Sequence, residues 1–232
     1  MDYCFPAPPQ PFVPIAESPQ AYPVHRIYCV GRNYADHARE MGASGREAPF
    51  FFAKPADAVL RTGLEPIAVP YPDRTSDLQH EVELVVALGA PGYRVTVEQA
   101  ARLVWGYAVG LDLTRRDLQA EAKRTGRPWD VGKGFERSAP IGAIRPAAQV
   151  GILGGRRIWL DVNGQPRQVG QLSQMIWSVE ETIAQLSGYF ELQAGDLIFT
   201  GTPAGVGPLV PGDRVDAGID GIGTIRMRIA DR

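Results

Sequence analysis

Hydrophobic and polar residues alternate in short blocks along the chain, and most of these blocks have the length of a β-strand. The run HEVELVVAL (80–88) predicts a strand that enters a core, and WGYAVGLDL (105–113) predicts a second buried strand. Two further blocks, at 158–169 and 214–229, contain Asn-Gly and Asp-Gly pairs and predict tight hairpins. These short strands, together with 26 glycines, favour a β-rich α+β fold.

Capping patterns mark the starts of short helices between the strands. Thr96 and Ser178 are each followed three residues later by Gln or Glu, the arrangement of a capping box, before VEQAARLV and VEETIAQLSGYF. Thr114 is placed to cap RRDLQAEAKRTG, which ends at Gly126. NYADHAREMG predicts another short helix, closed by Gly42. We expect these helices at the periphery of the strands.

The first 24 residues differ in composition from the rest. They contain seven prolines and predict an extended arm without a helix, draped over the body of the protein. Residues 25–232 show no internal repeat and no composition break. We therefore expect a proline-rich arm, 1–24, followed by a single domain.

Composition excludes several classes of protein. The 24 basic and 26 acidic residues are well mixed, which argues against a nucleic-acid-binding face and against disorder. Two cysteines, Cys4 and Cys29, supply neither a disulfide framework nor a zinc site. The absence of a membrane-length apolar run and of a signal-peptide pattern predicts a cytoplasmic protein without a membrane partner.

Two glutamates lie at the mouth of the first buried strand. Glu81 and Glu83 are two residues apart, so their side chains share a face and repel each other by roughly 2 kcal/mol. They either face solvent, or one is protonated, or a cation lies between them. Asp112 ends the second buried strand, where it could instead be a charge at a helix N-terminus. If the three carboxylates converge, they select a hard cation such as Mg²⁺ or Mn²⁺.

Arg116 and Gln119 are three residues apart and share one helix face. This is either a solvated face or a pair of donors aimed at an oxygen beside the cation. His37 and Glu40 have the same spacing, and a carboxylate beside an imidazole can make a general base. The alternative is an exposed pair of little consequence.

The other histidines and the glycine-rich stretches offer fewer candidates. Alternation turns His80 away from the two glutamates, and His25 has no evident partner. GRPWDVGKG lacks the spacing of a phosphate loop. FTGTPAGVG (199–207) is a tight turn whose backbone N–H groups can bind an anion or a carboxylate.

Taken together, these segments resemble the fumarylacetoacetate hydrolase family, in its small single-domain branch. The matching stretches run in the family's order and cover most of the chain from 28 to 223; the proline-rich arm lies outside them. They are YCVGRNYADHAREMG, FFFAKPADAV, TSDLQHEVELVVALG, GYAVGLDLTRRDLQ, GKGFERSAP, WLDVNG, MIWSVEETI and GDLIFTGTPAGVGP. The resemblance implies the family's β-roll fold, a homodimer, and Mg²⁺ or Mn²⁺ as cofactor.

The resemblance also assigns roles to residues. The metal ligands of the family match Glu81, Glu83 and Asp112. The pair that activates water matches His37 and Glu40.

Five further positions follow from the same match. The residues that stabilise an oxyanion match Arg116, Gln119 and Lys133. Positions that line the substrate cavity match Lys54 and Thr202.

Within the branch, the chain is most similar to enzymes that cleave a C–C bond of acylpyruvates. The implied reaction is hydrolysis of a 2,4-dioxo acid to pyruvate and a second acid, with fumarylpyruvate of gentisate breakdown as the expected substrate. Oxaloacetate decarboxylation, or tautomerisation or hydration of a related oxo acid, is the alternative within the family. A non-catalytic protein that holds a cation for structure is the alternative outside it.

Overall fold

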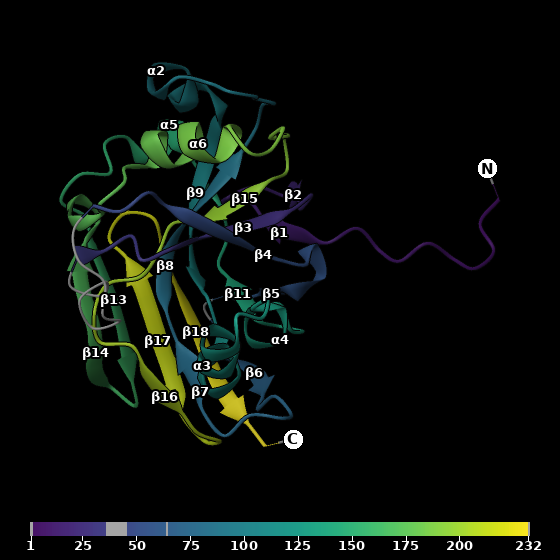
Figure 1. The fold of residues 1–232 in the computed structure, drawn as a ribbon, viewed down its shortest axis with the longest axis vertical. Helices are drawn as coiled ribbons and strands as arrows, with labels where there is room; N and C mark the ends of the chain where they lie inside the picture. The colour runs from purple at the N-terminus through teal and green to yellow at the C-terminus, as the bar shows by residue number, and fades with distance from the viewer. Residues whose placement is uncertain (1, 36–45, 64, 232) are drawn as a thin grey trace.

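The computed structural model describes residues 2–35, 46–63 and 65–231, and it is built mainly of short strands (Figure 1). An eight-stranded sheet has the order β4-β3-β15-β8-β9-β11-β5, with β12 also paired to β9. Its strands are β3 (Ile27–Gly31), β4 (Phe50–Lys54), β5 (Val59–Arg61), β8 (Val82–Leu88), β9 (Val104–Leu111), β11 (Ala139–Ile141), β12 (Arg145–Pro146) and β15 (Leu197–Phe199).

A five-stranded sheet of order β14-β13-β17-β18-β6 curves against the first (Figure 1). Its strands are β6 (Ile67–Pro70), β13 (Arg157–Val162), β14 (Gln165–Gln171), β17 (Arg214–Ile219) and β18 (Gly223–Ala230). Two small sheets complete the strands: β1 (Phe12–Pro14) with β2 (Ala21–Pro23), and β7 (Leu78–His80) with β10 (Thr114–Arg115) and β16 (Gly207–Leu209).

The helices are short and lie around the strands, as the sequence predicts. They are α2 (Val97–Ala100), α3 (Arg116–Thr125), α4 (Asp130–Lys133), α5 (Ala147–Val150) and α6 (Val179–Ser187), with 3-10 turns at Ala56–Ala58, Ala101–Leu103 and Leu172–Gln174. Among the described residues, no helix is long and apolar enough to span a bilayer. The arrangement confirms the β-rich α+β prediction.

Strand β8 lies at the centre of the molecule because it is covered on both faces. All seven of its residues are buried, and it pairs antiparallel with β15 on one side and β9 on the other. Strands β13 and β17 of the five-stranded sheet pack against β8. Leu84 of β8, Ile158 of β13 and Val215 of β17 belong to one apolar cluster. A nearly continuous apolar run is what such a doubly covered strand requires.

Both predicted hairpins form. Asn163 and Gly164 connect β13 to β14 with φ angles of 54° and 75°, the left-handed pair that a two-residue hairpin turn needs. The second hairpin joins β17 to β18 around Gly221, which has φ 71°.

The predicted helix starts hold at two of the three described positions. Thr96 and Ser178 form complete capping boxes at α2 and α6, and Gly126 ends α3 with φ 65°. Thr114 does not cap α3: the residue before the helix is Arg115, and no side chain caps it. The Thr114 hydroxyl instead donates to the backbone oxygen of Asp112 and accepts from a lysine, so its hydrogen-bonding capacity is used elsewhere.

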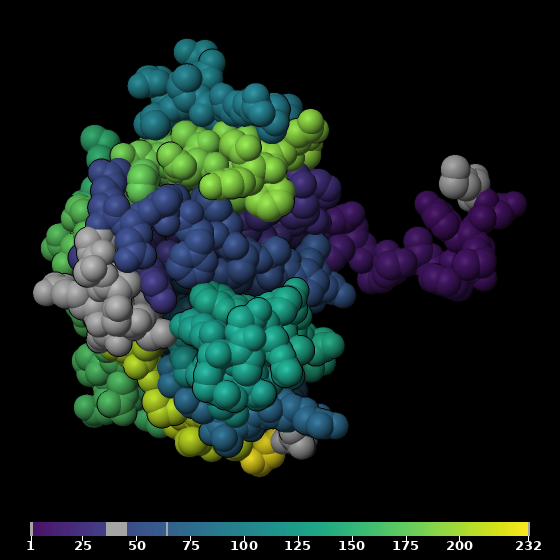
Figure 2. Space-filling model, in the orientation of Figure 1, coloured from purple at the N-terminus to yellow at the C-terminus, as the bar shows by residue number. Residues whose placement is uncertain are grey.

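The proline-rich arm has no helix among its described residues, and its second half packs onto the body. Strands β1 and β2 pair with each other, and Val13 and Tyr22 are buried beneath the large sheet. The Tyr22 hydroxyl lies 2.7 Å from the backbone oxygen of Leu88 and 3.0 Å from that of Asp196. The segment before β1 extends away from the body (Figures 1 and 2).

Figure 2 shows the segment that contains α3 and α4, in teal, against the strand segment around β4, in blue. Helix α4 contacts β4, and α3 contacts α4. These two helices therefore close one end of the central strands, at the edge where β8 begins and β9 ends.

We predict that Tyr22→Phe lowers the free energy of unfolding by about 1 kcal/mol, because it removes a buried hydrogen bond to carbonyl oxygens that keep their backbone donors. Urea unfolding measures the change. Tyr3→Phe is the matched control, since Tyr3 is 70% exposed on the arm. Equal stability of the two variants would contradict a structural role for the Tyr22 hydroxyl.

Candidate active site and metal centre

Three acidic side chains gather at the edge where β8 begins and β9 ends. Glu81 precedes β8, Glu83 lies in it, and Asp112 follows β9; one carboxylate oxygen from each lies within 4.8 Å of the others. Antiparallel pairing produces this convergence, because it sets Val82 opposite Leu111, and the Asp112 amide donates to the Glu81 backbone oxygen at 2.9 Å. All three acids are buried, so the solvent-exposed alternative is wrong for these residues.

Two lysines lie against these carboxylates. The Lys133 ammonium, at the end of α4, donates to Glu81 at 2.8 Å, to Asp112 at 2.6 Å and to the Thr114 hydroxyl at 2.7 Å. The Lys54 ammonium, at the end of β4, lies 2.9 Å from the other oxygen of Asp112. Burial alone would lower the pKa of Lys133, but the charges of Asp112 and Glu81 outweigh it and raise the pKa. Two buried cations therefore offset part of the charge of three buried acids.

Glu83 is held by the glycine-rich turn that follows β15. The backbone N–H of Gly201 donates to its carboxylate at 2.7 Å, which confirms that this turn binds a carboxylate. Gly201 has φ 97°, and a Cβ there would lie 2.7 Å from the Cβ of Asn33, so the close approach needs glycine. Burial, and then the charges of Asp112 and Glu81, raise the pKa of Glu83 well above its ordinary value.

This charge balance fits a divalent cation. Burial and the adjacent carboxylates thus disfavour the ionised form of Glu83 when only the protein's own cations are present. In the described part of the chain, the cluster consists of three converging carboxylates without cysteine or histidine, and carboxylate oxygens are the donors that hard divalent ions prefer. Glu81, Glu83 and Asp112 are thus suited to hold such an ion, and its charge would favour the ionised form of each.

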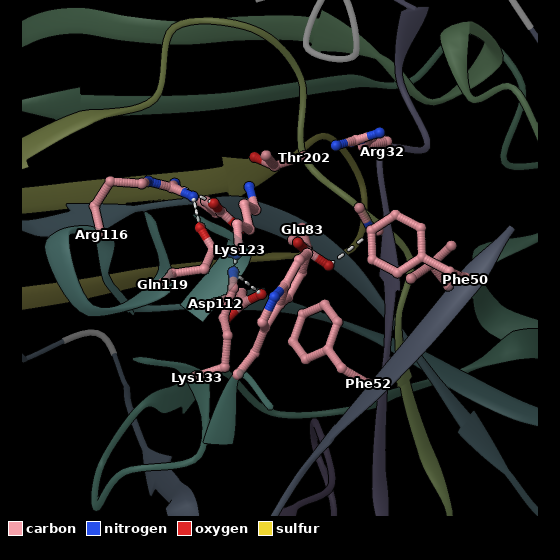
Figure 3. Close-up of a pocket in the computed structure, with 15 residues that line it drawn as sticks. Arg32, Phe50, Phe52, Glu83, Asp112, Arg116, Gln119, Lys123, Lys133 and Thr202 are labelled. Carbon is pink, nitrogen blue, oxygen red and sulfur yellow. Dashed lines mark hydrogen bonds and ion pairs between the residues drawn. The ribbon is translucent and has the colours of Figure 1, made fainter. Parts of the chain in front are cut away.

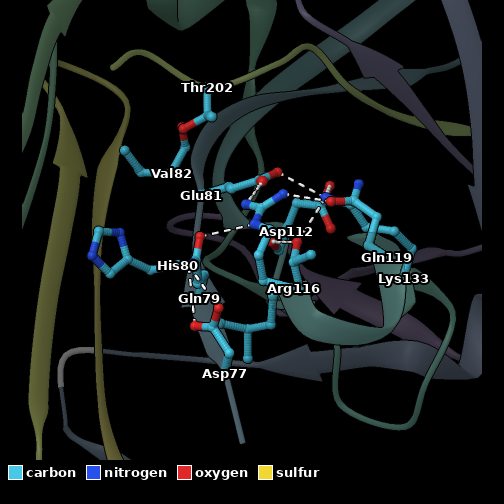
Figure 4. A network of polar contacts seen from close by, with 12 residues as sticks. Asp77, Gln79, His80, Glu81, Val82, Asp112, Arg116, Gln119, Lys133 and Thr202 are labelled. Atoms are coloured by element: carbon cyan, nitrogen blue, oxygen red, sulfur yellow. Dashed lines mark hydrogen bonds and ion pairs between the residues drawn. The ribbon is translucent and has the colours of Figure 1, made fainter. Parts of the chain in front are cut away.

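Helix α3 turns two polar side chains toward the acids (Figure 4). The Arg116 guanidinium donates to the Glu81 carboxylate, to Gln79 Oε1 at 2.8 Å and to Gln119 Oε1 at 2.6 Å. With this oxygen engaged, Gln119 presents its amide NH₂ as a donor to the pocket that it lines. The solvated-face alternative is therefore wrong for this pair.

Of the two residues expected to line the substrate cavity, one lies in the pocket wall and the other does not. Thr202 does line the pocket, but its hydroxyl donates to Val82 O and accepts from the Gln168 amide, each at 2.7 Å. Lys54 lies behind Asp112 instead of in the pocket wall, because its ammonium is also held by the backbone oxygens of Leu113 and Lys133. Its contact with Asp112 makes it a positioning residue for that carboxylate.

His37 and Glu40 lie outside the described residues. Of the two other histidines, His80 points away from the acids (Figure 4) and its Nδ1 lies 2.9 Å from Gln168 Oε1. Burial lowers the pKa of His80. His25, which has no evident partner in the sequence, lies 2.8 Å from Asp196.

The pocket beside the acids has further walls that the sequence did not point to (Figure 3). Lys123 of α3 and Arg32, just after β3, add positive charge, and three aromatic side chains complete the lining: Phe50, Phe52 and Trp129. The sequence contains one indication that Lys123 belongs to the site, namely the rarity of lysine. The chain has 24 basic residues but only three lysines, at 54, 123 and 133, and the other two bind the acids.

We predict that Glu83→Gln weakens binding of Mn²⁺ by about 100-fold or more, since losing a ligand should cost at least as much as losing an outer partner. Titration calorimetry measures the dissociation constant. Glu136→Gln, which removes an exposed acid near the pocket, is the control. The same Mn²⁺ affinity in both variants would contradict the proposed ligand set.

We predict that the ion-free protein loses stability as the pH rises above 4.5, the ordinary pKa of Glu83. The unfolded chain releases this proton near that pH, whereas the folded protein keeps it up to a higher pH. The unfolded state then binds fewer protons, so the free energy of unfolding falls with pH until the raised pKa is passed.

Urea unfolding at a series of pH values, with chelator or with Mg²⁺, tests this dependence. Glu83→Gln should flatten the ion-free profile and Glu136→Gln should leave it intact. Identical slopes in wild type and Glu83→Gln would place the proton elsewhere.

Comparison with known proteins agrees with this geometry. Residues 26–230 match the family described as fumarylacetoacetate (FAA) hydrolase, C-terminal. A fumarylpyruvate hydrolase of a Ralstonia species is 46% identical over 183 residues, covering 79% of this chain and 93% of the relative. The mitochondrial oxaloacetate tautomerase FAHD1 of Mus musculus is 43% identical over 203 residues, covering 88% and 90%.

A solved structure is also similar along its whole length. The crystal structure of fumarylpyruvate hydrolase from Pseudomonas aeruginosa, in complex with Mn²⁺ and pyruvate, superimposes with a TM-score of 0.97 at 49% identity and covers all of both chains. Sequence match, fold and acidic cluster agree, and the chain belongs to the fumarylacetoacetate hydrolase family of enzymes.

Proposed function

We propose that the protein hydrolyses the C3–C4 bond of a 2,4-dioxo acid, with fumarylpyruvate as substrate and pyruvate and fumarate as products. The observation that carries this proposal is the buried cluster of Glu81, Glu83 and Asp112 in the wall of a pocket that also presents Arg116 and Gln119. A similar protein of known structure binds Mn²⁺ and pyruvate, and a second relative is a fumarylpyruvate hydrolase.

The three acids would hold Mg²⁺ or Mn²⁺. When bound, this ion would supply Lewis-acid chemistry that stabilises negative charge on the pyruvate half of the substrate. Lys133 and Lys54 fix the carboxylates of Glu81 and Asp112 around that position. The carboxylates are thereby oriented before substrate enters.

The chain's own residues supply the remaining steps. His37, oriented by Glu40, takes a proton from water, and the hydroxide adds to the C4 carbonyl carbon. Arg116 and Gln119 are the N–H donors for the oxygen that becomes negative at C4, and each such donor contributes about 2.7–4 kcal/mol. Lys133, which the resemblance placed in the same set, already gives its three N–H groups to two carboxylates and a hydroxyl, so it orients the acids instead. The C3–C4 bond then breaks, its electron pair passes to the pyruvate half, and C3 takes up the proton.

A second candidate function is supported by the oxaloacetate tautomerase at 43% identity. Tautomerisation moves a proton at C3 of a dicarboxylic oxo acid, and decarboxylation of the same acid also leaves charge on a pyruvate fragment. Neither reaction adds water to a carbonyl carbon. The acid cluster serves all three reactions, so the water-activating pair distinguishes them.

The proposed setting is the last step of gentisate breakdown, an aromatic catabolic pathway, carried out in the cytoplasm by a homodimer. Neither of the two cysteines forms a disulfide, which suits a reducing compartment. No nucleic acid or membrane partner is proposed.

We predict that His37→Ala lowers kcat for fumarylpyruvate by about 10²–10⁴-fold, the contribution of a general base. Pyruvate release measures the rate, and chelator should abolish turnover until Mg²⁺ or Mn²⁺ is restored. His25→Ala is the control, because His25 pairs with Asp196 away from the pocket. Wild-type turnover by His37→Ala, or oxaloacetate as the only substrate converted, would exclude the hydrolytic scheme.

A further inference from the structure

Lys123 lines a pocket that contains three acids, yet it forms a salt bridge with no carboxylate in the described part of the chain. It is half-buried on α3, and among the described residues no carboxylate lies within ion-pair distance of its ammonium. Its nearest ring is Trp129, whose centroid lies 4.9 Å from the ammonium nitrogen. The other two lysines of the chain are both bonded to the acid cluster. Lys123 therefore lies at the site as a cation that is not paired with any of the three described acids.

Most of the charges that act on Lys123 are also positive, with Glu81 as the exception. Burial, and then the charges of Arg116, Arg32 and Lys133, lower the pKa of Lys123 to about 8. Among the described residues, the pocket lining holds four basic side chains and three carboxylates. An anion placed here would stabilise the ammonium form and relieve the repulsion.

Arg32 lies on the opposite rim. Figure 3 shows its guanidinium directed toward the side of the pocket that Lys123 faces. The guanidinium stacks over Phe50 at 5.7 Å, and its acidic neighbour Glu47 lies 4.0 Å away with 61% of its side chain exposed. Such a long, exposed ion pair is weak, so Arg32 remains available to a ligand.

Part of the pocket wall is aromatic. Trp129 packs against Phe50 edge-on, with centroids 5.4 Å apart, and against Phe52 at 5.7 Å. A flat, conjugated chain fits such a wall better than a hydrated polar one. The pocket lining thus combines an acid cluster, aromatic side chains and the two cations Lys123 and Arg32.

We propose that Lys123 and Arg32 bind the distal carboxylate of a dicarboxylic substrate and so select fumaryl-type acylpyruvates over those with a neutral acyl group. This inference rests on the proposed function and names the substrate class for it. Lys123 contributes one charged hydrogen bond and Arg32 a second, while the aromatic wall accommodates the double bond of the acyl chain. Neither residue is assigned a part in bond cleavage.

The test compares two substrates that differ only at the far end. Crotonylpyruvate is fumarylpyruvate with a methyl group in place of the distal carboxylate. In Lys123→Met, the ratio of kcat/KM for fumarylpyruvate to that for crotonylpyruvate should fall roughly 10- to 100-fold, the loss expected for one charged hydrogen bond, mainly through KM. Arg32→Met should lower the same ratio.

Two further variants control for charge. Lys123→Arg keeps the cation and should retain most of the ratio. Arg124→Met removes a positive charge from the next, exposed position of the same helix and should leave the ratio unchanged. An equal loss for both substrates in Lys123→Met, or no loss for either, would overturn the assignment.

Fumarate binding to Lys123 can be measured by NMR without any turnover. Reductive ¹³C-methylation labels only three lysines and the N-terminal amine, and Lys54 and Lys133 are buried, so the Lys123 signal can be identified by its loss in Lys123→Met. In the Mg²⁺-loaded protein, fumarate should shift this signal and neutral fumaramide should not.

These results separate the two proposals. A wild type that releases pyruvate from neither substrate contradicts the proposed function, while a fumarate-dependent shift would still support the anion site. Hydrolysis of both substrates with an unchanged ratio in Lys123→Met, or a Lys123 signal that fumarate does not move, contradicts the anion site alone.

Discussion

The structure depends on keeping three carboxylates close together inside a core. Placing like charges in a low-dielectric interior is unfavourable unless cations and hydrogen bonds accompany them. Here Lys133 bridges Glu81 and Asp112, Lys54 lies against Asp112, and the Gly201 amide binds Glu83. These partners come from β4, α4 and the turn after β15, so the fold itself assembles around the acid cluster. Burial and the neighbouring acids still disfavour the ionised form of Glu83, and a divalent ion bound between the carboxylates would favour it.

The strands, the helix starts and the position of the acid cluster could largely be predicted from local sequence. Apolar runs located β8 and β9, capping boxes located α2 and α6, and antiparallel pairing of the two strands then brings their acids to one edge. Strand alternation correctly separated His80 from Glu81. The resemblance to the family added roles for residues, but the geometry of the acids follows from the strands alone.

Other features could not be predicted because they depend on distant segments. Thr114 has the residue type and position of a helix cap, yet its hydroxyl is hydrogen-bonded to Lys133 and to the Asp112 backbone. Lys54 contacts Asp112 because the end of β4 lies beside that carboxylate, and no local sequence pattern indicates this contact. Lys123 has the spacing of an ordinary helix surface residue, and only the position of α3 beside the pocket gives its charge a use.

The central claim is that Glu81, Glu83 and Asp112 hold one divalent ion with positions left for substrate. Anomalous X-ray diffraction from crystals grown with Mn²⁺ tests this most directly. The account predicts a single strong manganese peak within bonding distance of all three carboxylates, with solvent or added oxalate completing its coordination. A manganese peak at another site, with these carboxylates still bonded only to protein groups, would contradict it.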